Sequence, residues 1–177
     1  MPTDYKEASR KEAEQIRKTL TQLDALLETN RLTTVYASDA TELRAQVSDL
    51  LENFRTSLES LARVDREDVF GTDPTFAQQR FKLIQRLEGA KITYDSQVLP
   101  SLARLTSQIV EQAKAAPPGT LDVSALPPPA SGERWTVERV VTAAERLVEQ
   151  GSKAVGAATK GYALVKALGL LVGIPIP

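Results

Sequence analysis

Apolar residues in the first part of the chain recur with the spacing of an α-helix. Asp4 is followed three residues later by Glu7, a capping-box pattern that predicts where this helix starts. Steps of three and four residues then connect Ala13, Ile16, Leu20, Leu23 and Leu27. Because residues with this spacing share one face of a helix, the pattern predicts a long amphipathic helix. The β-branched stretch at residues 30–38 breaks the pattern and predicts a connection.

A second and clearer stripe follows this connection. Asp39 and Glu42 repeat the capping-box spacing and predict a helix start. The stripe consists of large apolar residues that we expect to be buried, namely Leu43, Val47, Leu50, Phe54, Leu58 and Leu61. Gly71 then indicates a stop. Asp73 and Pro74 predict the next start, with proline at the first helical position.

The third helical pattern extends from Pro74 to about residue 116 and contains a proline in its interior. Its apolar positions form two groups: Phe76, Phe81, Ile84 and Leu87, and then Tyr94, Val98, Leu102, Leu105 and Ile109. Pro100 cannot donate a backbone hydrogen bond and disfavours helical dihedral angles at Leu99. We therefore expect a kink near Leu99, with a split into two helices as the alternative. The aromatic residues Phe54, Phe76 and Phe81 are interpreted as core residues rather than a ligand cage.

A proline-rich segment separates this pattern from the C-terminal part of the chain. Residues 115–132 read AAPPGTLDVSALPPPASG, a composition typical of a linker with polyproline character. We expect three parts: a helical bundle at 1–115, a linker at 116–134, and a C-terminal amphipathic helix with an apolar tail at 135–177. Thr136 is expected to cap this last helix, with Trp135 packed against Val140.

The C-terminal helix is predicted to be continuous and to carry a basic stripe opposite its apolar face. The apolar spacing holds from Val137 to Val165. The basic stripe consists of Arg139, Arg146, Lys153, Lys160 and Lys166. Acidic residues occur only in the first half, glycine becomes frequent from Gly151 onward, and the end, ALGLLVGIPIP, has no charged side chain. These features are typical either of one more bundle helix or of a membrane-active interfacial helix.

The end of the chain is too apolar to be left in water. Its large side chains, among them Tyr162, Leu164, Leu168, Leu171 and Ile174, would form a larger exposed patch than soluble monomers usually carry. We expect this segment to pack against the bundle, with a second copy or a membrane as the alternatives. The terminal Ile-Pro-Ile-Pro is interpreted as a helix stop, with the filling of a groove by Ile174 and Ile176 as the alternative.

The composition narrows the possible chemistry, because the chain has neither cysteine nor histidine. Thiol nucleophiles, serine–histidine–aspartate triads and thiolate or imidazole metal sites are therefore excluded. The sequence contains no glycine-rich phosphate loop. The acidic residues Asp65, Glu67, Asp68 and Asp73 lack the spacing of a calcium loop and are interpreted as turn residues. A net charge of −1 gives no reason to expect nucleic acid as a partner.

These patterns together predict an all-α fold. The expected architecture is an antiparallel bundle of three long helices, the third kinked or split near Pro100, plus a C-terminal amphipathic helix rich in glycine and alanine. We expect no enzymatic activity, no cofactor, no bound metal and no small-molecule substrate. The N-terminus lacks the apolar run of a secretory signal, which predicts a cytoplasmic protein.

The predicted function is that of a helical protein–protein interaction or scaffold module, which can also self-associate. The alternative is a membrane-targeting or membrane-disrupting effector that binds an anionic membrane surface through its C-terminal helix and is peripheral to the membrane. In either case the residues expected to make the contact are Arg139, Arg146, Lys153, Lys160, Lys166, Tyr162, Leu164, Leu168, Leu171, Ile174 and Ile176.

Overall fold

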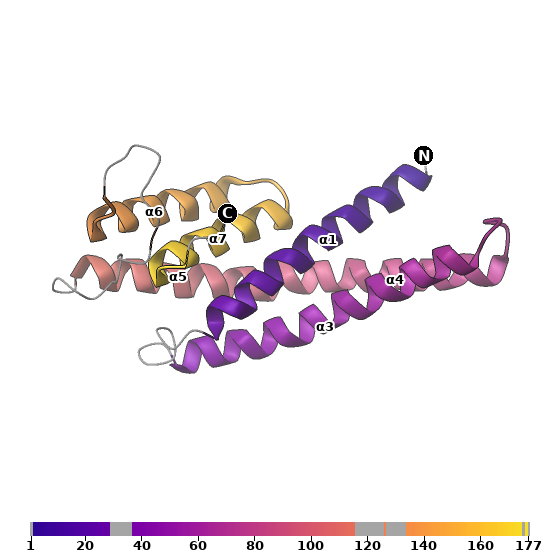
Figure 1. The fold of residues 1–177 in the computed structure, drawn as a ribbon, viewed down its shortest axis with the longest axis horizontal. Helices are drawn as coiled ribbons and strands as arrows, with labels where there is room; N and C mark the ends of the chain where they lie inside the picture. Colours follow the sequence, from indigo (N-terminus) through magenta and orange to yellow (C-terminus); the bar gives the residue numbers. More distant parts are fainter. Residues whose placement is uncertain (1, 29–36, 116–125, 127–133, 175, 177) are drawn as a thin grey trace.

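The chain folds into helices and the turns between them, as its computed structural model shows (Figure 1). The structure describes residues 2–28, 37–115, 126, 134–174 and 176. No strand occurs in these ranges, so the all-α prediction is confirmed for them. Residues 30–36 of the expected connection and most of the proline-rich linker lie outside the described residues.

The two N-terminal helices bury the stripes that their spacing predicts. Helix α1 spans Pro2–Leu27 and helix α3 spans Ala37–Glu67. Every apolar residue of the first stripe and of the second stripe is buried. The start of α3 differs from the expectation, because the helix begins at Ala37 and Asp39 lies inside its first turn. An acidic residue is favourable there as well, since it interacts with the positive end of the helix dipole.

A long helical segment forms the axis along which the other helices pack (Figure 1). Its first part, α4, spans Pro74–Thr93 and starts as expected, with the Asp73 carboxylate accepting a hydrogen bond from the Thr75 N–H at 2.8 Å. Its last part, α5, spans Leu99–Ala115. Between them lies a π-turn, η1, at Tyr94–Val98. The irregularity expected near Pro100 is thus a turn of wider helix.

The π-turn accommodates Pro100. A proline removes the hydrogen bond to the carbonyl four residues earlier, here that of Ser96, and its ring crowds that carbonyl. In η1 the hydrogen bonds reach one residue further back, so that the Leu99 N–H donates to the Tyr94 carbonyl. The wider turn leaves room for the proline ring, and Leu99 keeps helical angles of φ −62° and ψ −44°. The expectation that Leu99 departs from helical geometry is therefore wrong.

The packing of the helices differs between the two ends of the long segment. Helix α4 packs against α3 and, less extensively, against α1. Helix α5 is covered by the C-terminal helices α6 and α7, and α7 also packs against α1 (Figure 1). As a result α5 is enclosed by more neighbours than α4.

The C-terminal segment forms a helical hairpin, which corrects the expectation of one continuous helix. Helix α6 spans Val137–Lys153 and helix α7 spans Ala157–Val172. The backbone becomes extended at Ala154, with ψ 146°, and Gly156 then takes φ +95°, a value that other residues rarely adopt. The apolar spacing continues across the break, so periodicity does not reveal it. Val155, expected on the apolar face, is 94% exposed.

The hairpin packs against the rest of the same chain. Thr136 caps α6 as expected, since its hydroxyl accepts a hydrogen bond from the Arg139 N–H at 3.3 Å. The residues of α7 that are buried in the common core include Leu164, Val165, Leu168, Leu171 and Val172. Leu126, from the proline-rich segment, is buried in the same core. The structure therefore shows the intramolecular cover that we expect for the apolar end of the chain.

Phe81 is not a core residue, contrary to expectation. Phe54 is fully buried and Phe76 is partly buried, but Phe81 is 61% exposed. The inner side of α4 is formed by Leu87 and by the partly buried Leu83. Residues two positions apart are separated by about 200° around a helix. Phe81 therefore lies on the side of α4 opposite Leu83.

Truncating the buried face of α3 should destabilise the protein. Leu50→Ala removes a buried side chain, and we expect the free energy of unfolding to fall by about 2–5 kcal/mol. Urea unfolding followed by circular dichroism measures this change. Asp49→Ala, on the exposed side of the same turn, is the matched control and should change it by less than about 0.5 kcal/mol. Equal losses in the two variants would show that this face of α3 is not core.

Candidate interaction surface

The basic residues predicted to contact a partner are divided between the two helices of the hairpin. Arg139, Arg146 and Lys153 are exposed on α6, whereas Lys160 and Lys166 are partly buried on α7. Lys153 Nζ pairs with Glu149 at 2.6 Å, and Lys166 Nζ lies 5.1 Å from the centre of the Tyr162 ring. The break at Gly156 interrupts the single basic stripe that the sequence predicts.

The apolar residues predicted for the same site are mostly inside the protein. Leu164, Leu168 and Leu171 are buried in the core, whereas Tyr162 and Ile174 are exposed. The predicted basic and apolar residues therefore do not meet on one exposed surface of the chain.

The end of α7 is a helix stop, as the terminal sequence indicates. Gly173 adopts the left-handed conformation at φ +78°, and the Ile174 N–H donates to the Gly169 carbonyl at 2.8 Å. This is the hydrogen bond of a Schellman motif. Ile176 folds back over α7, since a Cβ added at Gly169 would lie 2.9 Å from its side chain.

The hairpin meets η1 in a contact that requires glycine. Gly161 of α7 lies over Tyr94, and a Cβ added at position 161 would overlap the tyrosine hydroxyl and lie 2.8 Å from the ring carbon Cζ. The same atom would lie 3.2 Å from Leu99 Cδ2. A side chain at position 161 would therefore force α7 away from the π-turn.

Tyr94 is fully buried, and its hydroxyl has no hydrogen-bond partner among the described residues. An unpaired buried polar group of this kind costs about 1–3 kcal/mol. Burial raises the pKa of the Tyr94 hydroxyl, and the nearby charge of Asp95 raises it further. The contact beneath Gly161 is thus closely packed but electrostatically unfavourable.

A buried lysine ties α1 to α4. Lys91 Nζ donates to Ser9 Oγ at 2.8 Å and to carboxylate oxygens of Glu12 and Glu88 at 3.2 Å each. The Ser9 hydroxyl donates to Glu88. This hydrogen bond is the main cause that lowers the pKa of Glu88, and Lys91 lowers it further against the opposing effect of burial. All three ammonium donors of Lys91 are in use, so this serine–lysine pair is a structural tie.

The acidic residues near the end of α3 hold arginines from two other helices. Arg80 of α4 donates to Asp65 at 2.8 Å and to the buried Asp68 at 2.6 Å. Arg10 of α1 donates to the other oxygen of Asp65 at 2.9 Å. Among the described residues no group of three or more acidic side chains is placed to hold a metal ion. The carboxylates therefore join three helices at this end of the molecule.

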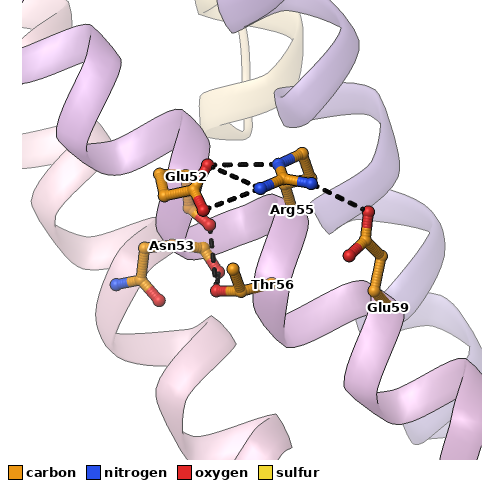
Figure 2. A network of polar contacts seen from close by, with 5 residues as sticks. All are labelled: Glu52, Asn53, Arg55, Thr56 and Glu59. Atoms are coloured by element: carbon orange, nitrogen blue, oxygen red, sulfur yellow. Dashed lines mark hydrogen bonds and ion pairs between the residues drawn. The ribbon is translucent and has the colours of Figure 1, made fainter.

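The arginine network on the outer side of α3 is also internally paired (Figure 2). Figure 2 shows Arg55 between two glutamates of its own helix, with Glu52 at 2.8 Å and Glu59 at 3.2 Å. The hydrogen bond from Arg55 lowers the pKa of Glu52.

Arg55 and Glu59 also line a cleft of about 330 Å³ between α1 and α3, together with Arg10 and Arg17. Because Arg10 and Arg55 are neutralised by carboxylates, this cleft is a weak candidate for an anion site.

Large apolar side chains are exposed at the end of the molecule where α3 turns into α4. We call this region the apolar tip and define it as Val69 and Phe70 of the turn between the two helices. Val69 is 77% exposed and Phe70 is 88% exposed. The sequence signal, which our prediction missed, is an apolar pair placed in a turn between two helices, where polar residues are usual.

One exposed face of α4 consists mostly of uncharged residues, with the exposed Lys82 beside Gln78 and Gln85. We call it the α4 stripe, and it consists of Gln78, Phe81, Gln85, Gly89, Ile92 and, in η1, Ser96. These residues follow one another at helical steps of three and four. Gly89 costs the helix about 1 kcal/mol relative to alanine. In the described part of the chain nothing lies within 4 Å of a Cβ added there, so packing within the chain does not require this glycine.

No known family model, curated protein or solved structure matches the chain. In the ranges that the structure describes, no helix is both long enough and apolar enough to cross a membrane.

Removing the Tyr94 hydroxyl tests the contact between Gly161 and Tyr94. Tyr94→Phe loses no hydrogen bond, so we expect the free energy of unfolding to rise by about 1–3 kcal/mol. Gly161→Ala should lower the free energy of unfolding, because the added methyl group overlaps the Tyr94 hydroxyl. The double variant, Tyr94→Phe with Gly161→Ala, should recover part of this loss. Denaturant unfolding gives all three values.

Gly89→Ala is the matched control, because position 89 is open and alanine should raise helix stability by about 1 kcal/mol. If Gly161→Ala lowered the free energy of unfolding equally in the wild type and in Tyr94→Phe, the Tyr94 hydroxyl would not be the group that position 161 contacts.

The raised pKa of Tyr94 should also appear in the pH dependence of stability. The unfolded hydroxyl ionises near pH 10, whereas the folded hydroxyl stays protonated above that pH. Stability is thus fully present below about pH 10 and falls by about 1.4 kcal/mol per pH unit above it. Tyr94→Phe lacks this loss. The stability difference between the variant and the wild type should be constant from about pH 7 to 9 and widen above pH 10.

Proposed function

We propose that the protein is a non-enzymatic helical interaction module that binds proteins through its α3–α4 end. The observation that carries this proposal is the apolar tip, where Phe70 is 88% and Val69 is 77% exposed although most large apolar side chains of the described residues are buried or partly buried. Fully burying one such side chain stabilises a contact by about 1.5–3 kcal/mol. Aromatic side chains are also enriched among the residues that dominate binding energies.

The polar clusters support an interaction role rather than catalysis. The Lys91 cluster, the Arg80 cluster and the Arg55 network each pair their cations with carboxylates of the same chain. The Lys91 and Arg80 clusters join helices, and the Arg55 network lies on the surface of α3. The apolar tip, in contrast, has no counterpart that covers it among the described residues.

The membrane-active alternative is supported by the exposed basic residues Arg139, Arg146 and Lys153 of α6. It also requires Leu164 and Leu168 to leave the core, because both are buried against the rest of the chain. We therefore rank it second.

A photo-activated cross-linking residue placed at Phe70 tests the proposal in cells that express the full chain. We expect irradiation to give protein adducts of defined mass, because an apolar side chain at this position contacts the partner. The same residue at Glu59, exposed on the charged side of α3, is the control and should give none of these adducts. Equal labelling from both positions, or none from position 70, contradicts the proposed site.

Flotation with anionic vesicles separates the two functions in the same preparation. The interaction role predicts no co-flotation at moderate salt. Co-flotation that is lost when Arg146 and Lys153 are reversed to glutamate would support the membrane role instead.

A further inference from the structure

We infer that a polar cleft beside the π-turn binds a small organic anion, namely a phosphate ester or a carboxylate that also carries a hydroxyl group. The cleft has a volume of about 300 Å³, at the lower end of the range for small-molecule sites. One wall comes from α3 and the other from η1 and the start of α5. The lining residues are Gln46, Ser96, Gln97, Pro100, Ser101 and Arg104.

The cleft is separate from the surface proposed for protein binding. Gln46 lies about 30 Å along α3 from the end of the helix that carries the apolar tip. The inference therefore does not rest on the proposed interaction function, and either can fail without the other. No sequence motif marks the cleft, because its two walls come from segments far apart in the chain.

Arg104 supplies the positive charge of the cleft. Its side chain is exposed and forms neither an ion pair nor a hydrogen bond within the described part of the chain. None of the lining residues is acidic. Asp39 and Glu42 line an adjoining depression that includes Ser101 and Arg104, but neither carboxylate pairs with the guanidinium. A free guanidinium can bind a phosphate or carboxylate group through two parallel N–H donors.

This charge distinguishes the cleft from the one between α1 and α3. There Arg10 and Arg55 already pair with carboxylates of the same chain, so an anion would have to displace them. At Arg104 an anion displaces no such partner. A charge-assisted hydrogen bond is also stronger than one between neutral groups, which favours an anion over a neutral ligand.

Gln46 identifies the second group that the ligand carries. Its side-chain oxygen is buried and has no hydrogen-bond partner among the described residues. Buried polar atoms in folded proteins are nearly always hydrogen-bonded, so this oxygen calls for a donor from outside the chain. A hydroxyl group on a ligand in the cleft can donate to it, and the energetic cost of the unpaired oxygen then favours binding.

The π-turn forms the floor of the cleft with neutral donors. Such turns are frequent at functional sites, because the wider helix changes the directions of its side chains. Ser96 and Gln97 lie in η1, and Ser101 follows in α5. Their hydroxyl and amide groups can donate to the remaining oxygens of an anion held by Arg104. Pro100 adds a rigid apolar wall between them.

Amide NMR spectroscopy of the isotope-labelled full chain, titrated at constant ionic strength, tests the site. The probes are glycerol phosphate and glycerate, which share their hydroxyl groups but differ in the anion, with glycerol as the neutral control. We expect one or both anions to give saturable shifts at Gln97, Ser101 and the Arg104 side chain, with a dissociation constant below about 10 mM. Glycerol should give none. The tighter anion shows whether the cleft prefers a phosphate ester or a carboxylate.

Replacing the cation should weaken binding without unfolding the chain. Arg104→Gln should raise the dissociation constant of the tighter anion at least tenfold, because the substitution removes the charged donors. Arg86→Gln is the matched control, since Arg86 is an exposed arginine of α4 outside the cleft. This control should leave the dissociation constant unchanged.

Gln46→Leu separates the two contacts of the ligand. The variant should not lower the unfolding midpoint, since it removes an unpaired buried oxygen. We expect it to weaken binding of the tighter hydroxylated anion at least threefold and to leave binding of sulfate, which has no hydroxyl group, unchanged.

Three results would overturn the inference. The first is that neither anion gives saturable shifts around the cleft, and the second is that Arg104→Gln binds as tightly as the wild type. The third is a Gln46→Leu variant that binds the hydroxylated anion as tightly as the wild type, or that weakens sulfate to the same extent.

Discussion

The missing backbone N–H of Pro100 is the constraint on which the arrangement of the helices depends. Pro100 donates no helix hydrogen bond, and beside it the Leu99 N–H donates to the Tyr94 carbonyl, five residues back. Tyr94 lies within this wider turn, at the point where α7 docks. Helix α5 is enclosed by α6 and α7, whereas α4 packs mainly against α3 and α1.

Gly161 and Gly89 both lie in helix interiors but have opposite surroundings. At Gly161 the surrounding atoms leave no space, and the absence of a side chain allows α7 to lie over Tyr94. At Gly89 no atom of the described residues lies within 4 Å of an added Cβ, so packing among these residues does not require the glycine. The two residues look alike in the sequence, and only the packing around them shows that the first is required and the second is not.

Much of the helical content could be predicted from periodicity, because the stripes of α1 and α3 face one core. The hairpin break could not be predicted, since Gly156 interrupts the backbone while the apolar spacing continues. The helical step between Phe81 and Ile84 predicts that Phe81 is buried, yet α4 buries the side that carries Leu87. The residues of α7 that we expected at the surface are divided between the core and solvent. Periodicity could not predict this division, because the side of a strongly apolar helix that stays exposed depends on its neighbours.

Leu126 has a consequence for how firmly the C-terminal hairpin is held. It is buried in the common core, although it lies between the described helices in a proline-rich stretch of sequence. A chain fixed near the middle of a tether behaves as two short tethers, and each closes at a smaller entropic cost than one long loop. A contact at Leu126 therefore raises the local effective concentration of the hairpin at its docking surface.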